Sequence, residues 1–443
     1  MVGSEGQEAR PKVLLIGGDG GRSGVPRHLE HLLRACAGQA RFVVLSERDR
    51  GGYAALRQGA VRHICLAGLA SRARPWQMLR TGRWLARLIR REAPDLVWAH
   101  ARMAVVLLHL LVLAQALRGR LWRPGAEEGP RPALAITYHG LPFGVGHPAP
   151  LSRAALWLER LALRHGPPRC LIFLSPEARA GFRAAVGAEV CARHRLECLA
   201  NSSTVGPLPE REAPQEGAAA LRQVLVTGRL SRQKNLARAL RIFAALPGSY
   251  RIRFCGEGTD SHAFRRLARR VLGDAALRRV EMLGPVEDLR PLYAEADVFL
   301  LASRYEGQPI AALEAFEAGL PLVLPDLPEC RAMAAAHPHA ALLTGAIGAE
   351  DPAEDALRLV QLAEGQVRGG AARRAAIHAA WRHHAGFARW SRQMAALLER
   401  LLPSAATDSG TAPPPPRAPD PGQVLPFPLG RKPPQDAAPK SGS

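Results

Sequence analysis

The chain has 443 residues, of which 47% are hydrophobic, so it can bury sizeable cores and is not disordered throughout. Its 60 Lys and Arg residues against 39 Asp and Glu residues give a net charge of +21, which favours anionic partners such as nucleotides, phospholipid headgroups or nucleic acid. The seven cysteines show no C-x-x-C spacing, which excludes a disulfide framework or a zinc site built on such motifs and favours a reducing cytosol.

No targeting or membrane-spanning segment is predicted. Residues 1–10 are polar and lack the apolar run of a signal peptide. The longest apolar stretch, Met103 to Ala116, is interrupted by His109 and is too short to span a bilayer, so we expect a buried helix there. The protein is therefore expected to be cytoplasmic, either in solution or attached to the inner face of the cytoplasmic membrane.

Short apolar runs alternate with helical patterns over the first two hundred residues. Most of these runs are uninterrupted, as in parallel strands that are covered on both faces. The predicted strands are Val13–Ile16, Phe42–Leu45, Asp95–Ala99, Ala133–Tyr138 and Leu171–Ser175. The alternation predicts an α/β domain with a doubly wound parallel sheet.

A second series of the same kind follows a polar, Pro-rich segment at residues 206–217. Its predicted strands are Gln223–Thr227, Arg251–Cys255, Val280–Leu283, Val298–Ala302 and Pro321–Pro325. We expect two Rossmann-like domains, at residues 12–205 and 218–380, that face each other across a cleft. The helical pattern at residues 381–402 has no strand after it and is expected to pack back on the first domain.

The composition changes at Pro403. Eleven of the 37 prolines lie between Pro413 and Pro439, among small and polar residues. Such a segment cannot bury enough apolar surface to offset its ordering entropy, so residues 403–443 are predicted to be a disordered tail. A docking role for its four consecutive prolines is the alternative.

A glycine-rich loop, Gly17 to Gly24, lies between the first predicted strand and a helix. Glycines at this position let backbone N–H groups approach a phosphate at the helix N-terminus. A dinucleotide site is one alternative, because Glu47 ends the second strand, where a ribose-binding acid is expected. The G-x-G-x-x-G spacing fails, however, since Ser23 occupies the last position, and a plain flexible turn is the other alternative.

Two cations follow the first strand of the second series, after the turn at Gly228. Arg229 and Lys234 are five residues apart and suit a diphosphate leaving group, whose developing charge they would neutralise. Before the tail, Lys occurs only at positions 12 and 234 in a chain that otherwise uses Arg, which favours a point-charge donor at Lys234. A surface cation without a ligand is the alternative.

Two glutamates lie in a strand, loop and helix segment, Ser303 to Gly319. Pro309 fits the first turn of the helix and Gly319 its end. Glu306 then lies in the loop at the strand end, and Glu314 lies on the helix among apolar residues, where an acid needs a partner. Each carboxylate can accept two hydrogen bonds from vicinal hydroxyls, which suits a sugar and a ribose; solvated helix acids are the alternative.

One histidine, His139, ends the fourth predicted strand in the sequence Thr-Tyr-His-Gly. It could face the cleft as a hydrogen-bond donor, although a lone histidine is more often structural.

These segments resemble motifs of the retaining glycosyltransferases of the GT4-type family (glycosyl transferases group 1), which have the GT-B fold. Ser303 to Gly319 is similar to the E-x7-E signature, and Gly228 to Lys234 is similar to the G-R-x-x-x-x-K segment. Ile252–Gly258 resembles the G-x-G loop, and Ser23–His28 the G-G-x-x-x-H stretch. The resemblance extends over about residues 12–402. It departs from the family at Ser23, which replaces a glycine, and at Asn201-Ser202-Ser203, where Asn-Gly is usual.

The resemblance implies roles for seven residues. The predicted catalytic residues are Glu306 and His139, and the predicted donor-binding residues are Gly24, Arg229, Lys234, Gly307 and Glu314. In the family, the two cations bind the donor diphosphate and the second glutamate binds the ribose. The first glutamate contacts the donor sugar, and the histidine lies beside it.

We therefore expect a hexosyl-type transferase that moves a sugar from a nucleotide-sugar to a glycan or lipid-linked acceptor with retention of configuration, in bacterial surface polysaccharide or glycolipid assembly. The resemblance implies front-face attack without a protein nucleophile. No metal and no other cofactor are expected, because Arg229 and Lys234 can stabilise the leaving diphosphate instead. The alternatives are a catalytically silent glycan-binding protein and a nucleic-acid binder. A nucleic-acid partner is not expected, because the basic residues are dispersed along amphipathic helices.

A basic helix is predicted from Arg74 to Arg91. Four arginines fall on one of its faces, with tryptophans nearby, which suits an anionic membrane surface. They are Arg80, Arg83, Arg87 and Arg91. An ordinary amphipathic helix solvated by arginine is the alternative.

Overall fold

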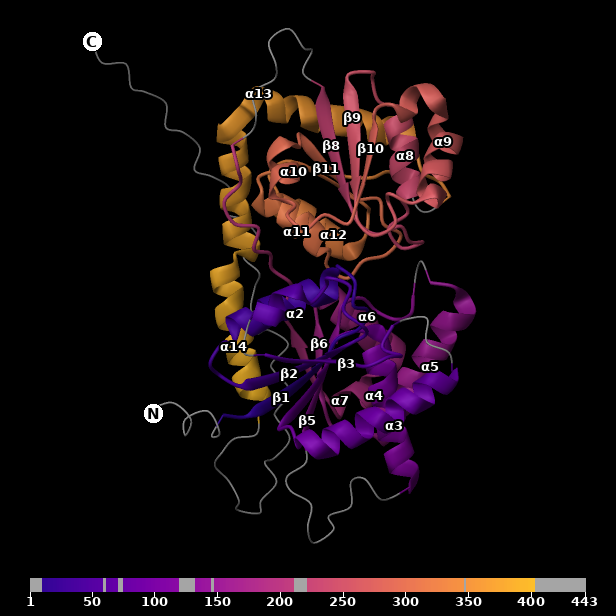
Figure 1. Cartoon of the computed structure of the whole chain (residues 1–443), viewed down its shortest axis with the longest axis vertical. Coiled ribbons are helices and arrows are strands. Elements are labelled where there is room, and N and C mark those ends of the chain that lie inside the picture. Colours follow the sequence, from indigo (N-terminus) through magenta and orange to yellow (C-terminus); the bar gives the residue numbers. More distant parts are fainter. Residues whose placement is uncertain are drawn as a thin grey trace, which may run out of the picture. The chain divides into compact units, whose positions relative to one another are not determined.

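The computed structural model describes residues 10–58, 61–70, 75–118, 132–144, 147–210, 221–345 and 348–402. Its described part forms two lobes, each built on a parallel sheet (Figure 1). We call the part built on the seven-stranded sheet the N-lobe and the part built on the six-stranded sheet the C-lobe. The tail predicted for residues 403–443 lies outside the described residues.

The N-lobe sheet has the strand order β3-β2-β1-β4-β5-β6-β7, and all neighbouring strands pair in parallel. The strands are β1 Lys12–Ile16, β2 Arg41–Ser46, β3 Arg62–Cys65, β4 Leu96–Ala99, β5 Ala133–Tyr138, β6 Cys170–Phe173 and β7 Arg195–Cys198. Its helices are α2 Gly24–Ala35, α3 Pro75–Glu92, α4 Arg102–Arg118, α5 Ala149–His165, α6 Pro176–Val186 and α7 Ala188–Ala192. Helices α3 to α7 pack on one face of the sheet, and α2 packs on the other.

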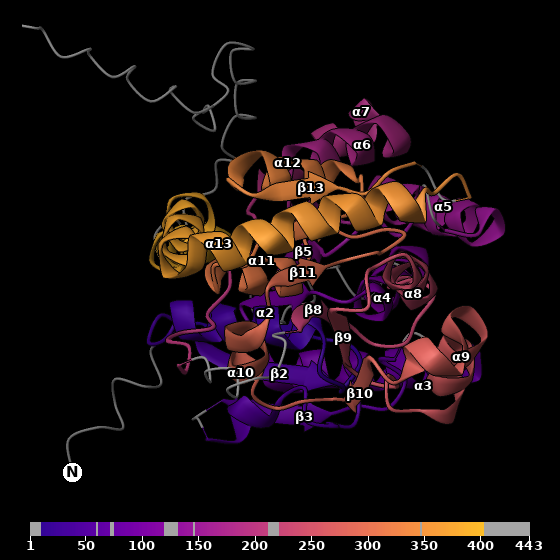
Figure 2. The same cartoon turned by 90° about the horizontal axis from the view of Figure 1, so that it is seen from above.

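The C-lobe sheet has the strand order β10-β9-β8-β11-β12-β13 and is also parallel. The strands are β8 Arg222–Thr227, β9 Tyr250–Cys255, β10 Val280–Gly284, β11 Val298–Leu300, β12 Leu322–Leu324 and β13 Ala340–Leu342. The helices are α8 Leu236–Ala244, α9 His262–Leu277, α10 Arg290–Glu295, α11 Ile310–Glu317 and α12 Pro328–Ala336. Helices α8 and α9 contribute to the core on one face, and α10 to α12 to the core on the other (Figure 2).

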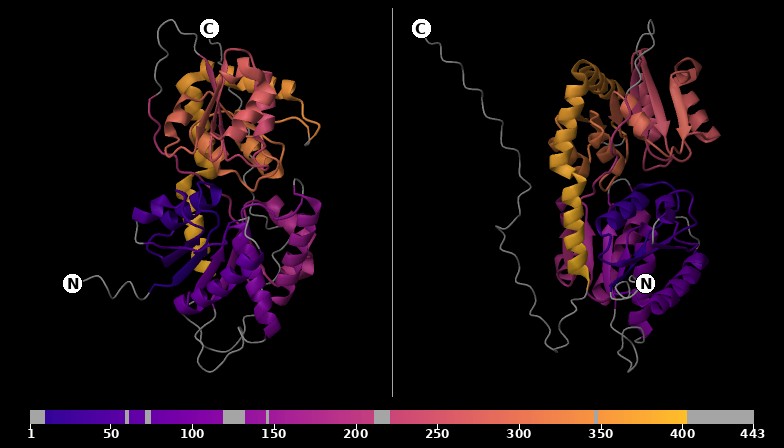
Figure 3. Two further views of the ribbon diagram at one scale, coloured as in Figure 1. Left: turned by 45° about the vertical axis from the view of Figure 1, so that its right-hand side comes forward. Right: turned by 60° about the vertical axis from the view of Figure 1, so that its left-hand side comes forward.

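Two C-terminal helices, α13 Pro352–Ala385 and α14 Phe387–Leu401, run along both lobes (Figure 3). Helix α13 kinks at Gly370, so that its first part packs on one C-lobe core and its second part on the other. Helix α14 packs on the N-lobe instead, where Trp390, Met394 and Leu398 are buried beside α2. The chain thus returns to the lobe in which it began.

All ten predicted strands are present, with bounds that differ by at most two residues, and the described part of the chain contains three further strands that were not predicted. The missed strands β3, β7 and β13 lie at sheet edges. Edge strands are covered less completely, and β3 (Arg-His-Ile-Cys) and β7 (Arg-Leu-Glu-Cys) have only four residues each, two of them charged or polar. Such segments are too short and too polar to differ from loops in the sequence.

The apolar stretch from Met103 to Ala116 lies in α4, and much of α4 is buried in the N-lobe, as expected. His109 within it contacts Glu159 at 2.8 Å. Among the described residues, no helix is both long and apolar enough to cross a membrane.

His337, after α12, is buried as a neutral ring. Its Nδ1 accepts the His339 N–H at 2.9 Å, and its Nε2 lies 3.0 Å from the Leu320 carbonyl oxygen, to which it donates. Burial lowers the pKa of His337 to about 3. The unfolded chain therefore takes up a proton as the pH falls through about 6.5, while the folded chain does not.

We predict that this histidine makes the protein less stable in mild acid. Between pH 7.5 and 5.5, His337 should lower the free energy of unfolding by about 1.4 kcal/mol. Urea unfolding at both pH values should show a loss that is smaller by this amount in His337→Gln than in the wild type, because other buried histidines such as His139 contribute equally to both proteins. The exposed His262→Gln serves as control and should keep the wild-type dependence. Equal pH dependence in all three proteins would contradict the prediction.

Candidate functional site

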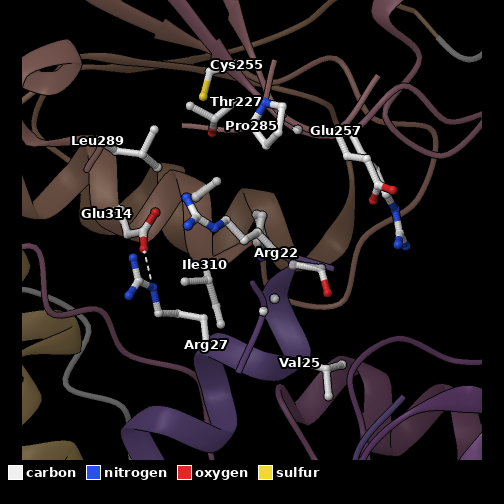
Figure 4. Close-up of a pocket in the computed structure, with 18 of the residues that line it drawn as sticks. Arg22, Val25, Arg27, Thr227, Cys255, Glu257, Pro285, Leu289, Ile310 and Glu314 are labelled. Carbon is white, nitrogen blue, oxygen red and sulfur yellow. Dashed lines mark ion pairs between the residues drawn. The ribbon is translucent and has the colours of Figure 1, made fainter. Parts of the chain in front are cut away.

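A cavity of about 450 Å³ lies between the two lobes, within the usual range for small-molecule sites. Its walls come from α2, from the loops that follow β8, β9, β10 and β11, and from α11. Figure 4 shows side chains of α2, of α11 and of the C-lobe loops around it. Parallel strands carry their carboxyl ends to one edge of a sheet, where ligands of open α/β sheets bind. The residues after the strands of both sheets therefore meet here.

Lys234 and Glu306 form an ion pair in the cavity wall. Lys234 Nζ donates to Glu306 Oε1 at 2.7 Å, and both side chains are largely buried. The Lys234 stem runs over Gly228, which has φ +154°. A Cβ at this glycine would lie 3.1 Å from the Lys234 stem, so Gly228 leaves room for the side chain. An ammonium has three donors, and the two that remain can serve an anionic ligand.

Arg229 lies on the same cavity wall and is less constrained. Its side chain is 40% exposed, and its guanidinium lies 3.9 Å from Asp19 of the N-lobe glycine loop. A long pair of this kind in partial contact with water is weak. Arg229 can therefore turn towards an anion that enters the cavity.

Glu314 is buried in α11 and has two partners. Tyr293 donates its hydroxyl to Glu314 Oε2 at 3.0 Å, and Arg27 Nε from α2 lies 3.2 Å from Oε1 (Figure 4). Burial raises the pKa of Glu314, although Arg27 and Tyr293 act in the opposite direction. The buried acid is thus paired across the two lobes, as its apolar surroundings require.

His139 follows β5 and lines the same cavity. It packs edge-on against His28 of α2, with ring centroids 4.5 Å apart. Burial lowers the pKa of His139 well below its ordinary value, so the ring is neutral near pH 7. Its Nε2 has no hydrogen-bond partner among the described residues.

The two glycines named from the sequence differ in position. Gly24 lines the cavity at the first turn of α2. Gly307 is not among the lining residues, but its backbone packs closely on the other lobe. A Cβ at Gly307 would lie 2.2 Å from the His139 carbonyl oxygen. The structure therefore brings six of the seven predicted residues to one cavity, and Gly307 to a close contact beside it.

Several charged residues that line the cavity, in both lobes, were not singled out from the sequence. The cavity lining contains four basic and five acidic side chains, namely Arg22, Arg27, Arg229, Lys234, Glu30, Glu257, Glu287, Glu306 and Glu314. Pairs such as Arg22–Glu287, at 3.2 Å, join the lobes. No local signal marks Arg27, which is one arginine in an amphipathic helix of a chain rich in arginine.

The Asn201-Ser202-Ser203 segment connects the two lobes through side-chain hydrogen bonds. Asn201 Oδ1 contacts His28 Nδ1 at 3.0 Å, and Asn201 Nδ2 donates to the Gln308 carbonyl at 3.0 Å. Ser202 donates to the Ala385 carbonyl at 2.6 Å. The segment that departs from the family pattern is thus held by both lobes and by α13.

The dinucleotide alternative fails at Glu47. Its Oε2 accepts the backbone N–H groups of Gly68, Leu69 and Ala70 at 2.8 to 3.1 Å. This carboxylate orders a loop of the N-lobe and is not among the residues that line the cavity.

Two family models match the chain. One, described as Glycosyl transferases group 1, matches residues 222–364, and the other, described as Glycosyltransferase Family 4, matches residues 22–197. The chain belongs to the GT4-type family of group 1 glycosyltransferases. The predicted resemblance is thereby confirmed for both lobes, and the chain is a glycosyltransferase.

A curated relative of this glycosyltransferase is the GDP-mannose:cellobiosyl-diphosphopolyprenol alpha-mannosyltransferase of Xanthomonas oryzae pv. oryzae (strain PXO99A). It is 33% identical over 147 residues, which make up 32% of this chain and 37% of the relative. The match therefore spans little more than a third of the relative's length.

Solved structures share the fold of this glycosyltransferase. Anabaena Alr3699/HepE in complex with UDP-glucose aligns with a TM-score of 0.65 and 17% identity, over 88% of this chain and 99% of that one. Sucrose-phosphate synthase from Thermosynechococcus elongatus aligns with a TM-score of 0.68 and 16% identity, over 88% and 99%. The expected GT-B architecture of two Rossmann-like units is confirmed.

We predict that Gly307 is required for the close approach of the lobes. Gly307→Ala should lower the free energy of unfolding by about 1–3 kcal/mol, because its methyl group would overlap the His139 carbonyl oxygen. Urea unfolding measures this loss. Gly248→Ala, at a turn where a Cβ meets no atom within 4 Å, is the control and should change stability little. Equal stability of both variants would show that the lobes do not depend on this contact.

Proposed function

We propose that this glycosyltransferase moves a hexose from a nucleotide-sugar to a glycan or lipid-linked acceptor with retention of configuration. The observation that carries the proposal is the shared cavity that holds Arg229, Lys234, Glu306 and Glu314. Cations for a diphosphate and carboxylates for sugar hydroxyls are the groups that such a donor requires.

The donor diphosphate would bind Arg229 and Lys234. Lys234 keeps its bond to Glu306 and uses its remaining donors, while Arg229 exchanges its long contact with Asp19 for a phosphate oxygen. Charge grows on the diphosphate as the glycosidic bond breaks, so fixed cations stabilise the transition state more than the ground state. In this proposal the two side chains, rather than a metal ion, neutralise the leaving group.

The nucleoside would lie near α11, with its ribose hydroxyls on Glu314. One Glu314 oxygen already accepts from Tyr293, and the other pairs with Arg27. Each oxygen has a second lone pair, so the ribose can bind while both partners stay in place. The donor sugar would then lie between Glu306 and His139, both of which line the cavity.

Retention would follow from attack on the face that the diphosphate leaves. Glu306 is held by Lys234, which suits a carboxylate that positions sugar hydroxyls rather than one that attacks carbon. The departing diphosphate would accept the proton of the acceptor hydroxyl. The Xanthomonas relative uses GDP-mannose and a diphosphopolyprenol acceptor according to its name, and Alr3699/HepE is described with UDP-glucose. We propose surface polysaccharide or glycolipid assembly as the setting.

A nucleotide-sugar screen tests the proposal. UDP- and GDP-hexoses should be hydrolysed slowly without an acceptor, and the anomeric configuration of the product by NMR should match that of the donor. An inverted product would contradict retention. Nucleotide binding without turnover would favour the silent glycan-binding alternative, and the absence of both would reject the enzyme proposal.

We predict that the two cations act on the chemical step. Lys234→Ala and Arg229→Ala should each lower kcat and kcat/KM together by about a hundredfold, which is roughly 3 kcal/mol of lost stabilisation. Lys234→Arg should not restore activity, since a planar fork does not replace a compact ammonium. Steady-state kinetics measures these effects. Arg232→Ala, an exposed cation of the same loop that does not line the cavity, is the control. Wild-type turnover in Lys234→Ala would show that the diphosphate binds elsewhere.

We predict a different effect for the two glutamates. Glu314→Ala should raise the donor KM with little change in kcat, because a ribose contact is made equally in ground and transition states. Glu306→Ala should lower kcat more than nucleotide affinity, because its partner is the reacting sugar. Donor-dependent kinetics together with nucleotide titration separate the two outcomes. Indistinguishable kinetics in the two variants would contradict the assignment.

We further propose that α3 contacts an anionic membrane surface. Its arginines at 80, 83, 87, 90 and 91 are exposed, whereas Leu85 and Leu88 are buried against the sheet. Trp76 and Leu79, at its N-terminal end, are 56% and 65% exposed, which is uncommon for large apolar side chains. Exposed apolar residues beside a basic face suit an interfacial helix.

We predict that vesicle binding depends on this basic face. The protein should float with anionic vesicles and not with neutral ones, and Arg83→Glu/Arg87→Glu should weaken binding by about 1 kcal/mol or more per residue. The control is Arg265→Glu/Arg266→Glu, which reverses two exposed charges on α9 of the C-lobe. Equal flotation with neutral and anionic vesicles would leave α3 as an ordinary solvated helix.

A further inference from the structure

Three histidines from separate elements meet in the N-lobe, beside the cavity. His28 lies on α2, His100 directly follows β4, and His139 directly follows β5. Strands β1, β4 and β5 are neighbours in the sheet, and α2 follows β1, so the topology brings these positions together. One ring nitrogen from each histidine lies within 4.8 Å of the corresponding nitrogens of the other two.

The nitrogens of this cluster lack the partners that buried imidazoles require. His100 is 1% exposed, and neither of its ring nitrogens has a hydrogen-bond partner among the described residues. The same holds for Nε2 of His28 and for Nε2 of His139. Buried polar side-chain atoms are partnered in the large majority of cases, so four orphan nitrogens at one place need an explanation. Ring packing does not satisfy them.

A hydrogen bond also orients the first of these rings. Asn201 Nδ2 donates to the Gln308 carbonyl, so the atom that faces His28 Nδ1 is the Asn201 carbonyl oxygen. An amide oxygen only accepts, so His28 carries its proton on Nδ1 and presents a free lone pair on Nε2. Metal-binding histidines are typically oriented in this way, through the nitrogen that does not bind the metal.

We propose that His28, His100 and His139 bind a divalent first-row transition metal ion such as Zn²⁺. Neutral imidazoles suit such ions and do not suit Mg²⁺ or Ca²⁺. Because the three nitrogens lie within 4.8 Å of one another, a central point lies no more than about 2.8 Å from each, against about 2.0–2.1 Å for a Zn–N bond, so each ring must move by less than about 1 Å.

Three protein ligands leave a tetrahedral ion with an open position. His139 lines the cavity, so this position would face the space where substrates are proposed to bind. An oxygen of water or of a bound sugar would complete the coordination. The site lies apart from Arg229 and Lys234, which retain the diphosphate in the proposed function. Metal binding by the three histidines does not depend on transferase activity, because a metal titration tests it without a sugar donor.

Metal titration of the full chain without an affinity tag tests the proposal. After treatment with a chelator, the protein should bind one equivalent of Co²⁺ with the intense visible absorption of a tetrahedral site, and Zn²⁺ should displace it. His100→Ala and His139→Gln should each weaken binding by at least about a hundredfold. Asn201→Ala should weaken it by about tenfold, as expected for loss of an orienting partner.

The matched control is His31→Ala. His31 lies one turn along α2 from His28, is equally buried, and bonds Thr204 through Nε2 at 3.0 Å. This variant should bind Co²⁺ as the wild type does, and circular dichroism checks the folding of every variant. If His100→Ala does not fold, His139→Gln and Asn201→Ala carry the test. No saturable binding below millimolar Co²⁺, or equal binding by His139→Gln and the wild type, would overturn the proposal, whatever the transferase assay shows.

Discussion

Parallel strands carry all their carboxyl ends to one edge of a sheet, and in this protein two such edges line a common cavity. Several residues of the candidate site follow from that constraint. Lys234 and Glu306 come after β8 and β11 of the C-lobe, while His139 comes after β5 of the N-lobe. Helices α13 and α14 span both lobes, and α14 buries its apolar face in the N-lobe core. The cavity thus depends on apolar burial at a distance from it.

The charges that line the cavity are nearly all engaged with one another. Lys234 pairs with Glu306 within the C-lobe, and Arg27 pairs with Glu314 across the lobes. Buried pairs are weak sources of stability, because desolvation offsets much of their attraction. Their effect here is that the buried carboxylates of Glu306 and Glu314 each have a cationic partner before a ligand binds. In the proposed function, a donor with a diphosphate and two sugars would bind by sharing the partners of Lys234 and Glu314 and by replacing the long contact of Arg229 with Asp19.

The same constraint explains the histidine cluster of the N-lobe. Three neighbouring elements, α2, β4 and β5, each place one imidazole at the same edge of the sheet. Asn201 orients the first of these rings and also bonds Gln308 of the C-lobe. A ligand bound to the cluster would therefore contact a ring that is hydrogen-bonded to the segment that joins the lobes. The cluster lies beside the proposed sugar site, through His139.

The sequence by itself determined the two-sheet architecture, the central strands and the candidate residues of the C-lobe. Uninterrupted apolar runs mark strands that are buried on both faces. Arg229, Lys234, Glu306 and Glu314 lie in two short segments, and the spacing of the two cations and of the two glutamates can be recognised in the sequence. Only the tertiary structure decided the edge strands β3, β7 and β13, the pairing of Arg27 with Glu314, and the contact between His28 and Asn201, which are 173 residues apart. Local periodicity reports which face of an element is buried. Which distant side chains then meet depends on strand order and on how the lobes pack, and no short stretch of sequence carries that information.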